Sequence, residues 1–307
     1  LLYEQFVLKS ATLSKWVEAK TEFLQSDLNV DSVDSAAAGL TEVEQFEIEF
    51  NTKKSDLDAA CKLGNEVVEG KHPKSDEVTT AVDSFSTAST SLSDLAATRK
   101  ANLELQAAYQ QFLLDLAEAN TFLDEQQSTL GEEVAVSSVS DAKSQLKSIE
   151  SLVSEVKLFT QNVDSLNKDS QVIIDGGHDE TDSVKASVDE VNNKLKEIET
   201  SAGERKVLLE NELLYEMFKL KAAVITKWID SKQEMLESDL AVDSVESAKS
   251  GITQVSLFDS ELNSKSKEID VACALGADVV SGGHEKSDEV KATLAGFIES
   301  KTKMGDL

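Results

Sequence analysis

Three histidines are the side chains of this sequence best suited to acid–base chemistry or metal binding, because a neutral imidazole can exchange a proton near pH 7 or ligate a metal. They are His72, His178 and His284, spaced 106 residues apart, and each follows a glycine-containing corner. Catalysis would need a nucleophile or a second base beside them. No such constellation accompanies them, so we predict structural residues of helix corners and no enzyme.

One acidic cluster beside the second histidine could attract a divalent cation. It consists of Asp175, His178, Asp179, Glu180 and Asp182. The spacing differs from that of a calcium-binding loop, which favours weak counterion attraction over a metal site. The segment His284-Glu285-Lys286-Ser287-Asp288 begins like a zinc-protease motif but lacks the second histidine. We therefore expect no catalytic, cofactor-binding or metal-binding residue, and no cofactor.

Tryptophan and cysteine could supply partner contacts or redox chemistry. Trp16 and Trp228 are in helical phase with phenylalanines ten residues earlier, which favours core packing over an exposed hot spot. Cys61 and Cys273 lie on a predicted core seam, where free cysteine acts as a small hydrophobe; a reactive thiol is the alternative. Their spacing fits neither a disulfide nor a metal site, which indicates reduced thiols in the cytoplasm.

The charge balance restricts the partners. Of 307 residues, 58 are Asp or Glu and 30 are Lys or Arg, giving a formal net charge of −28. A basic surface for nucleic acid or anionic lipid is thereby excluded as the main function. No run of about 18 apolar residues predicts membrane insertion. The chain begins at Leu1 rather than at Met, so we expect it to be a piece of a longer protein.

A repeat of 106 residues organises the whole sequence. Aromatic, valine and histidine positions recur without insertion or deletion: Phe6, Phe112 and Phe218; Trp16, Phe122 and Trp228; Val33, Val139 and Val245. The predicted domains are repeat 1 (residues 1–106), repeat 2 (107–212) and repeat 3 (213–307), the last about eleven positions short. Repeats 1 and 3 are the more similar pair, which indicates duplication of a two-repeat block.

The spacing of apolar residues in each repeat predicts three amphipathic helices, and each helix buries one apolar stripe. In repeat 1 the stripes are Leu2, Phe6, Leu13, Trp16 and Phe23; Val33, Ala36, Leu40, Val43, Phe50, Leu57, Cys61 and Val68; and Val78, Val82, Phe85, Leu92 and Ala96. The second stripe recurs as Val245, Ala248, Ile252, Val255, Leu262, Ile269, Cys273 and Val280. The predicted fold class is all-α, with tandem left-handed three-helix bundles.

Loop chemistry supports these boundaries. Asp31-Ser32-Val33-Asp34 and Asp243-Ser244-Val245-Glu246 place an acceptor at a helix start and a carboxylate three residues later. The glycine corners at Gly70, Gly176 and Gly282 end the second helix, and Ser75, Thr181 or Ser287 starts the third.

The junctions between repeats contain no stop signal. Good helix formers run from Thr98 to Phe112, and the segment after Gly203 behaves alike. The third helix of one repeat should therefore continue as the first helix of the next, so we expect a semi-rigid rod of roughly 50 Å per repeat.

These residues resemble the spectrin repeat of the spectrin and alpha-actinin superfamily over the whole chain. The resemblance rests on the 106-residue period, on Phe6 followed by Trp16, and on the Ser26-Asp27-Leu28 turn, repeated as Ser238-Asp239-Leu240. It also rests on the Gly-x-His corners and on Arg99 or Arg205 before the junction. Two features depart from the family pattern: Phe122 replaces the first-helix Trp, and Ser89 and Leu195 lie near the expected third-helix Trp.

The resemblance implies a non-enzymatic spacer of a cytoskeletal actin-crosslinking protein, either spectrin-like or alpha-actinin-like. Actin would be bound only through modules outside this chain. The resemblance also implies an antiparallel homodimer in which repeat 1 faces repeat 3 and repeat 2 faces itself. A protein-docking scaffold is the alternative function, and it would need an exposed apolar patch.

Overall fold

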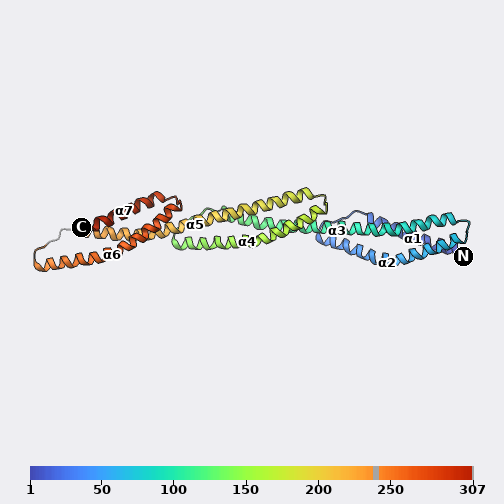
Figure 1. The fold of residues 1–307 in the computed structure, drawn as a ribbon, viewed down its shortest axis with the longest axis horizontal. Coiled ribbons are helices and arrows are strands. Elements are labelled where there is room, and N and C mark those ends of the chain that lie inside the picture. The colour runs from blue at the N-terminus through green and yellow to red at the C-terminus, as the bar shows by residue number, and fades with distance from the viewer. Residues whose placement is uncertain (238–241, 306–307) are drawn as a thin grey trace. The chain divides into compact units, whose positions relative to one another are not determined.

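The computed structural model describes residues 1–237 and 242–305 and shows seven helices and no strand within them. The helices are α1 (Leu2–Gln25), α2 (Val33–Glu69), α3 (Ser75–Gly131), α4 (Val139–Asp175), α5 (Thr181–Glu237), α6 (Val245–Ser281) and α7 (Ser287–Gly305) (Figure 1). The chain divides into two compact units, each made of two segments: unit 1 is Leu1–Phe122 with Gln161–Asn193, and unit 2 is Leu123–Thr160 with Lys194–Leu307.

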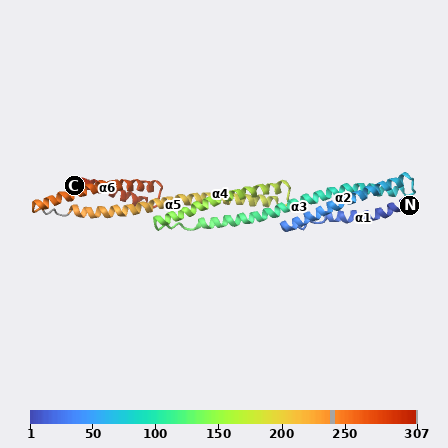
Figure 2. The same cartoon turned by 90° about the horizontal axis from the view of Figure 1, so that it is seen from below.

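The helix boundaries repeat with the period of the sequence. The middle helices α2, α4 and α6 are each 37 residues long and begin at the predicted valines. The helices α3 and α5 are each 57 residues long and run without a break across the predicted repeat junctions (Figure 2). The prediction of tandem helical bundles joined by continuous helices is confirmed. The predicted turn Ser238-Asp239-Leu240 lies outside the described residues.

Within unit 1, the core of repeat 1 contains layers that each take side chains from α1, α2 and α3. One layer contains Phe6, Val67 and Val78; the next contains Leu13, Leu57, Ala60 and Phe85; a third contains Leu24, Phe46, Phe50, Leu92 and Ala96. Each aromatic or leucine side chain so buried contributes roughly 1.5–3 kcal/mol to folding. The predicted stripes of repeat 1 supply most of these layers, and the structure adds residues that the stripes did not include: Leu24, Phe46, Ala60 and Val67.

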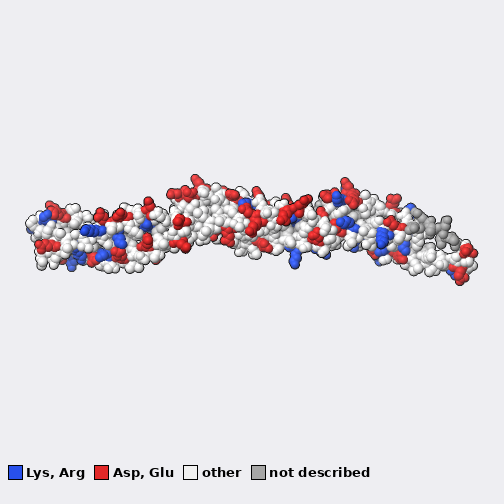
Figure 3. Space-filling view, turned by 180° about the vertical axis from the view of Figure 1, so that it is seen from behind, with Lys and Arg blue, Asp and Glu red and all other residues white. Residues whose placement is uncertain are grey.

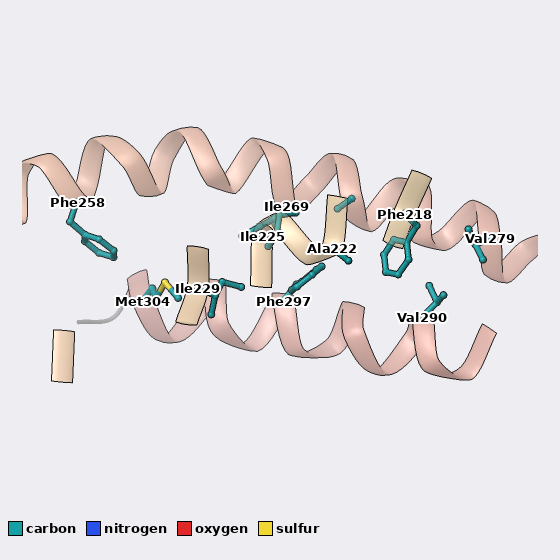
Figure 4. Close-up of a cluster of buried hydrophobic side chains, with 11 residues drawn as sticks. Phe218, Ala222, Ile225, Ile229, Phe258, Ile269, Val279, Val290, Phe297 and Met304 are labelled. Carbon is teal, nitrogen blue, oxygen red and sulfur yellow. The ribbon is translucent and has the colours of Figure 1, made fainter. Parts of the chain in front are cut away.

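Unit 2 contains the corresponding cluster of repeat 3, built from α5, α6 and α7 (Figure 4). Phe218 points from α5 between Val279 of α6 and Val290 of α7. Close helix approach depends on a glycine here: a Cβ on Gly276 would lie 2.9 Å from Cε2 of Phe218. Gly64, two periods earlier, has the same relation to Phe6, so both repeats use a glycine to seat the first-helix phenylalanine.

The caps of α2 and α6 differ from the prediction by one residue. Ser32 is the N-cap, and its Oγ accepts from the backbone N–H of Ser35 at 3.1 Å. The Ser35 hydroxyl in turn accepts from the N–H of Ser32 at 3.0 Å, and Ser244 and Ser247 repeat this box. The predicted Asp31-to-Asp34 pairing was therefore wrong, because the helix starts at Val33 and a serine occupies the third helical position.

Part of the predicted core seam is exposed. Leu2 is 46% exposed near the start of α1, and Val245, Ile252 and Val255 of α6 are 72%, 68% and 50% exposed. In repeat 1 the matching half of α2 is covered by the later turns of α3, where Leu103 packs onto Gly39. Within the described residues, α7 leaves the matching half of α6 exposed. The seam prediction was wrong for this half of α6 because periodicity does not say which neighbour covers a face.

Candidate functional site

The three histidine corners share one backbone arrangement that ends α2, α4 and α6. In the first, the N–H of His72 donates to the carbonyl of Val67, and the N–H of Lys71 donates to that of Val68. This is a Schellman cap, which requires a left-handed residue after the helix. That residue has φ of 57° at Lys71, 71° at Gly177 and 70° at Gly283. Repeats 2 and 3 thus use glycine where repeat 1 has a lysine in an unfavourable conformation.

Each imidazole folds back onto its own loop and onto a tyrosine of the first helix of its repeat. The ring centroids lie 4.3 Å apart for His72 and Tyr3, 4.2 Å for His178 and Tyr109, and 4.3 Å for His284 and Tyr215. Nδ1 accepts a hydrogen bond from the backbone N–H two residues later in all three corners. The histidine carbonyl accepts from the hydroxyl of Ser75, Thr181 or Ser287, which begins the next helix.

These contacts fix the tautomer of a neutral ring. Because Nδ1 accepts, the proton must be on Nε2. In repeat 3 the Nε2 of His284 lies 3.1 Å from Oε1 of Glu212, which can accept it. In repeat 2 the Nε2 of His178 is buried and has no hydrogen-bond partner among the residues that the structure describes. The residue one period before Glu212 is Gln106, so repeats 2 and 3 differ at the position that should serve this donor.

The arrangement gives these histidines a structural task. At His284 both ring nitrogens are engaged by the protein itself, and the two buried rings are each 7% exposed. Within the described part of the chain, no three His, Cys, Asp or Glu side chains converge as a metal site would require. Of the acidic set beside His178, Asp175 accepts from Gln171 instead. Lys286 pairs with Glu285 at 3.2 Å on the surface of the third corner.

Trp16 packs against the core with its ring and meets a carboxylate with its N–H. The ring is stacked with Phe46 and Phe50, and Nε1 donates to Oε1 of Glu49 at 2.6 Å. Lys20 pairs with the other oxygen of Glu49 at 2.7 Å. The Lys20 hydrogen bond, followed by that of Trp16, holds the pKa of Glu49 below its ordinary value. The predicted core packing of Trp16 applies to its ring, whereas its N–H forms a partly buried hydrogen bond to Glu49 that was not predicted.

Repeat 3 repeats this arrangement with the same residue types. Trp228 is half-buried against the core cluster, and Lys232 lies 2.6 Å from Glu261. Lys232, with a smaller contribution from Trp228, lowers the pKa of Glu261.

The two cysteines behave as partly buried core residues. Sγ of Cys61 lies 3.8 Å from the carbonyl of Val82, and Cys273 packs against the repeat 3 cluster. Burial, with the neighbouring carboxylates of Asp58 and Asp270, raises the pKa of each thiol. Since the thiolate is the reactive form, the core interpretation is favoured over a reactive thiol.

Two arginines have a role that the sequence analysis did not assign. Nη1 of Arg99 donates to the carbonyl of Ser26 at 2.6 Å, just past α1, and the guanidinium lies over Phe23. One period later, Nη1 of Arg205 donates to the carbonyls of Leu130 and Glu132 at the end of α3. The third helix of a bundle thus caps the C-terminus of its first helix. A signal was available, since these are the only arginines in the sequence.

A family model described as Spectrin repeat matches residues 1–105, 107–211 and 213–303. The chain belongs to the spectrin repeat family. Two relatives with established names align with nearly all of it. "Spectrin alpha chain, erythrocytic 1" of Mus musculus is 22% identical over 292 residues, which is 94% of this chain and 12% of the relative. "Spectrin beta chain" of Drosophila melanogaster is 21% identical over 290 residues, 93% of this chain and again 12% of the relative.

These spectrin repeats therefore span only about an eighth of either relative. Among the helices that the structure describes, none is both long and apolar enough to cross a membrane. The features that recur in the spectrin repeats are contacts that hold a bundle together: the histidine corner, the tryptophan-carboxylate contact and the capping arginine. The departure at Phe122 leaves the fold of repeat 2 intact, since the helices around it keep their boundaries.

Proposed function

We propose that this chain is a non-enzymatic structural spacer, the rod segment of a cytoskeletal protein. The continuity of α3 and α5 carries the proposal: each is 57 residues long and belongs to two successive repeats. A helix of that length extends about 85 Å at 1.5 Å per residue. Sharing it between repeats removes the flexible linker that would let them bend freely.

Within this proposal the folding units are the three repeats at residues 1–106, 107–212 and 213–307. Each pairs a middle helix with parts of the long helices on either side. No catalytic, cofactor-binding or metal-binding residue is assigned, because the recurring polar side chains are engaged in caps and corners.

We place the parent protein in the cytoplasm as a spectrin-like or alpha-actinin-like actin crosslinker. Actin would be bound by modules outside this chain, because actin filaments are acidic and this segment carries a net charge of −28. On the face drawn in Figure 3, acidic side chains are more frequent than basic ones along the middle stretch. The same charge argues against nucleic acid as a partner, and no membrane insertion is proposed.

Small-angle scattering of the purified chain tests the spacer. We expect a particle that is rod-like, roughly 150 Å long for three repeats of about 50 Å each. A compact particle, with the radius of gyration of a single globular domain of this length, would contradict the proposal.

Cosedimentation with actin filaments at moderate salt should leave the chain in the supernatant; pelleting with the filaments would contradict the assignment of actin binding to other modules.

Self-association is part of the proposal, because a crosslinker with one binding module per chain needs a second copy, and we propose antiparallel pairing.

A docking scaffold is the alternative function, and one observation favours it: large apolar side chains on the first helix of each repeat are exposed.

A further inference from the structure

A hollow opens in repeat 2 beside the end of its first helix. It has a volume of about 380 Å³ and is lined by the end of α3, the loop that follows, the first half of α4 and the middle of α5. Ile149, Leu152 and Leu209 line it and are buried. All of its lining residues belong to unit 2, so the hollow lies within one compact unit and has an apolar floor.

This hollow lies where repeat 1 has aromatic rings. In repeat 1 four aromatic side chains belong to the core layer around Leu24 or pack against it: Trp16, Phe23, Phe46 and Phe50. One period later, three of the four positions have side chains without a ring: Thr129, Leu152 and Val156. Protein interiors are close-packed, so lost side-chain volume that the neighbours do not refill remains open. Thr129 and Leu152 both line the hollow.

One wall of the hollow is the side chain of Arg205. Its counterpart in repeat 1, Arg99, is 9% exposed, and its guanidinium carbon lies 5.1 Å from the ring centroid of Phe23. In repeat 2 the position of Phe23 is taken by Thr129, and Arg205 is only half-buried. A guanidinium attracts the face of an aromatic ring. Arg205 is held in place by its hydrogen bonds to the end of α3, so the wall offers the group that contacts a ring in repeat 1.

The rim of the hollow is acidic. Glu132 and Glu133 line it and are exposed, and Arg205 is the one basic residue among the lining residues. The guanidinium of Arg205 already donates to backbone carbonyls, and the chain as a whole carries a net charge of −28. Complementary charge attracts a binding partner and orients it. A positively charged partner therefore fits this rim.

We propose that this hollow binds an aromatic side chain from a basic segment of another protein. The ring enters the hollow and lies against Arg205, as Phe23 lies against Arg99 in repeat 1. Lysine or arginine side chains on either side of the ring pair with Glu132 and Glu133. The docking site goes beyond the spacer function and does not depend on it.

Isothermal titration calorimetry of the whole chain with short peptides tests the site. The probe is a peptide with blocked ends and one phenylalanine between two lysines on each side, and we expect it to bind. Replacing its phenylalanine by leucine should weaken binding about fivefold, because leucine retains an apolar contact but not the attraction between ring and guanidinium. Replacing its four lysines by glutamates should abolish binding, because like charges would then meet at the rim.

Thr129→Phe supplies the ring that repeat 1 has at the corresponding position, so it should fill the hollow and weaken binding of the phenylalanine peptide at least tenfold. Thr121→Phe is the matched control. Both threonines are exposed on α3, and each hydroxyl donates to the carbonyl four residues earlier. Thr121 does not line the hollow, so its replacement should leave binding unchanged.

Glu132→Lys combined with Glu133→Lys tests the rim without changing the apolar floor. We expect this variant to bind the phenylalanine peptide about tenfold more weakly. Asp189→Lys combined with Glu190→Lys is its control, because this adjacent acidic pair is exposed on α5 and changes the net charge by the same amount. The control should retain most of the affinity.

Several outcomes would overturn the docking site. They are absence of binding at millimolar peptide, equal affinity for the phenylalanine and leucine peptides, and unchanged binding to the Thr129→Phe chain. Phenol that bound as tightly as the peptide, and competed with it, would identify a small aromatic molecule as the occupant and overturn the assignment of a protein partner. Each of these results leaves the rod-like scattering profile, and with it the spacer function, unaffected.

Discussion

At the scale of single residues, the repeats differ most informatively at the imidazole Nε2 of the corners. His284 has Glu212 as its acceptor at 3.1 Å, whereas the buried Nε2 of His178 has no acceptor in the described part of the chain. A buried donor without an acceptor costs about 1–3 kcal/mol. The Nε2–H donor of His178 in repeat 2 therefore lacks an acceptor. In repeat 3 the carboxylate of Glu212 provides that acceptor for His284.

Gln106→Glu should stabilise repeat 2, because it introduces the acceptor that Glu212 supplies in repeat 3. We expect the free energy of unfolding at pH 7 to rise by about 1 kcal/mol. The reciprocal change, Glu212→Gln, should weaken the corner of repeat 3. Urea unfolding and amide exchange of residues 172–184 measure the effect, with Glu104→Gln as the exposed control. If Gln106→Glu gave the same free energy of unfolding and the same amide exchange as the control, the assigned acceptor would be contradicted.

The ionisation of Glu49, which contacts Trp16, makes the stability of repeat 1 depend on pH. Its pKa is lowered in the folded state, chiefly by Lys20 and then by Trp16, so the ionised form contributes stability above the ordinary value of 4.5. This contribution is lost as the pH falls below that value. Glu49→Gln should therefore destabilise repeat 1 at pH 7 and lose less stability than the unaltered chain between pH 5 and about pH 3. Parallel acid titrations monitored by Trp fluorescence would refute this if the two curves stayed equally spaced.

At the scale of elements, the ends of the helices distinguish the repeats. The left-handed residue of the Schellman cap is glycine in repeats 2 and 3 and Lys71 in repeat 1. A non-glycine residue in this conformation costs roughly 1–2 kcal/mol. The first helix of repeats 1 and 2 ends instead on an arginine from the third helix, so its cap depends on bundle formation.

Lys71→Gly should stabilise repeat 1 by about 0.5–1 kcal/mol, less than the full conformational cost because glycine also loosens the unfolded chain. The matched reversal, Gly283→Lys, should destabilise repeat 3 by a similar amount. A Cβ at Gly283 meets no atom within 4 Å, so this reversal tests backbone conformation without a steric clash. Thermal unfolding compares both variants; opposite shifts in Tm are expected, and shifts of the same sign would count against the explanation.

At the scale of the whole molecule, the shared helices are the property on which the proposed spacer function depends. Ala101 and Val207 lie one period apart, both are exposed, and both are interior to a 57-residue helix. Proline at such a position removes a helix hydrogen bond and kinks or breaks the helix, at about 3 kcal/mol or more. These side chains are not part of the bundle cores, so proline should interrupt the helix between two repeats without disturbing the packing of either core.

Ala101→Pro combined with Val207→Pro should shorten the maximum dimension in small-angle scattering, while each bundle keeps most of its helical signal. Ala101→Ser with Val207→Ser is the control and should leave the dimension unchanged. An unchanged dimension in the proline variant would show that the shared helices do not determine the length of the chain.

The sequence by itself determined the period, the helix boundaries and most of the core. The starts of α2, α4 and α6, the unbroken junctions and the positions of Phe6, Leu57 and Phe85 all follow from local patterns of apolar residues, glycine and helix formers. Such patterns act over a few turns of helix, where the backbone geometry fixes which side chains share a face. They can be extracted from the sequence without knowledge of the partners.

Only the tertiary structure decided which group each polar or apolar side chain meets. Arg99 reaches a carbonyl 73 residues away, and Glu212 lies 72 residues before the imidazole that it serves. The exposure of Val255, in phase with a buried stripe, depends on which part of α6 the neighbouring helices cover. These contacts depend on how the helices are rotated and staggered in the bundle, and side-chain spacing within one helix contains no information about that arrangement.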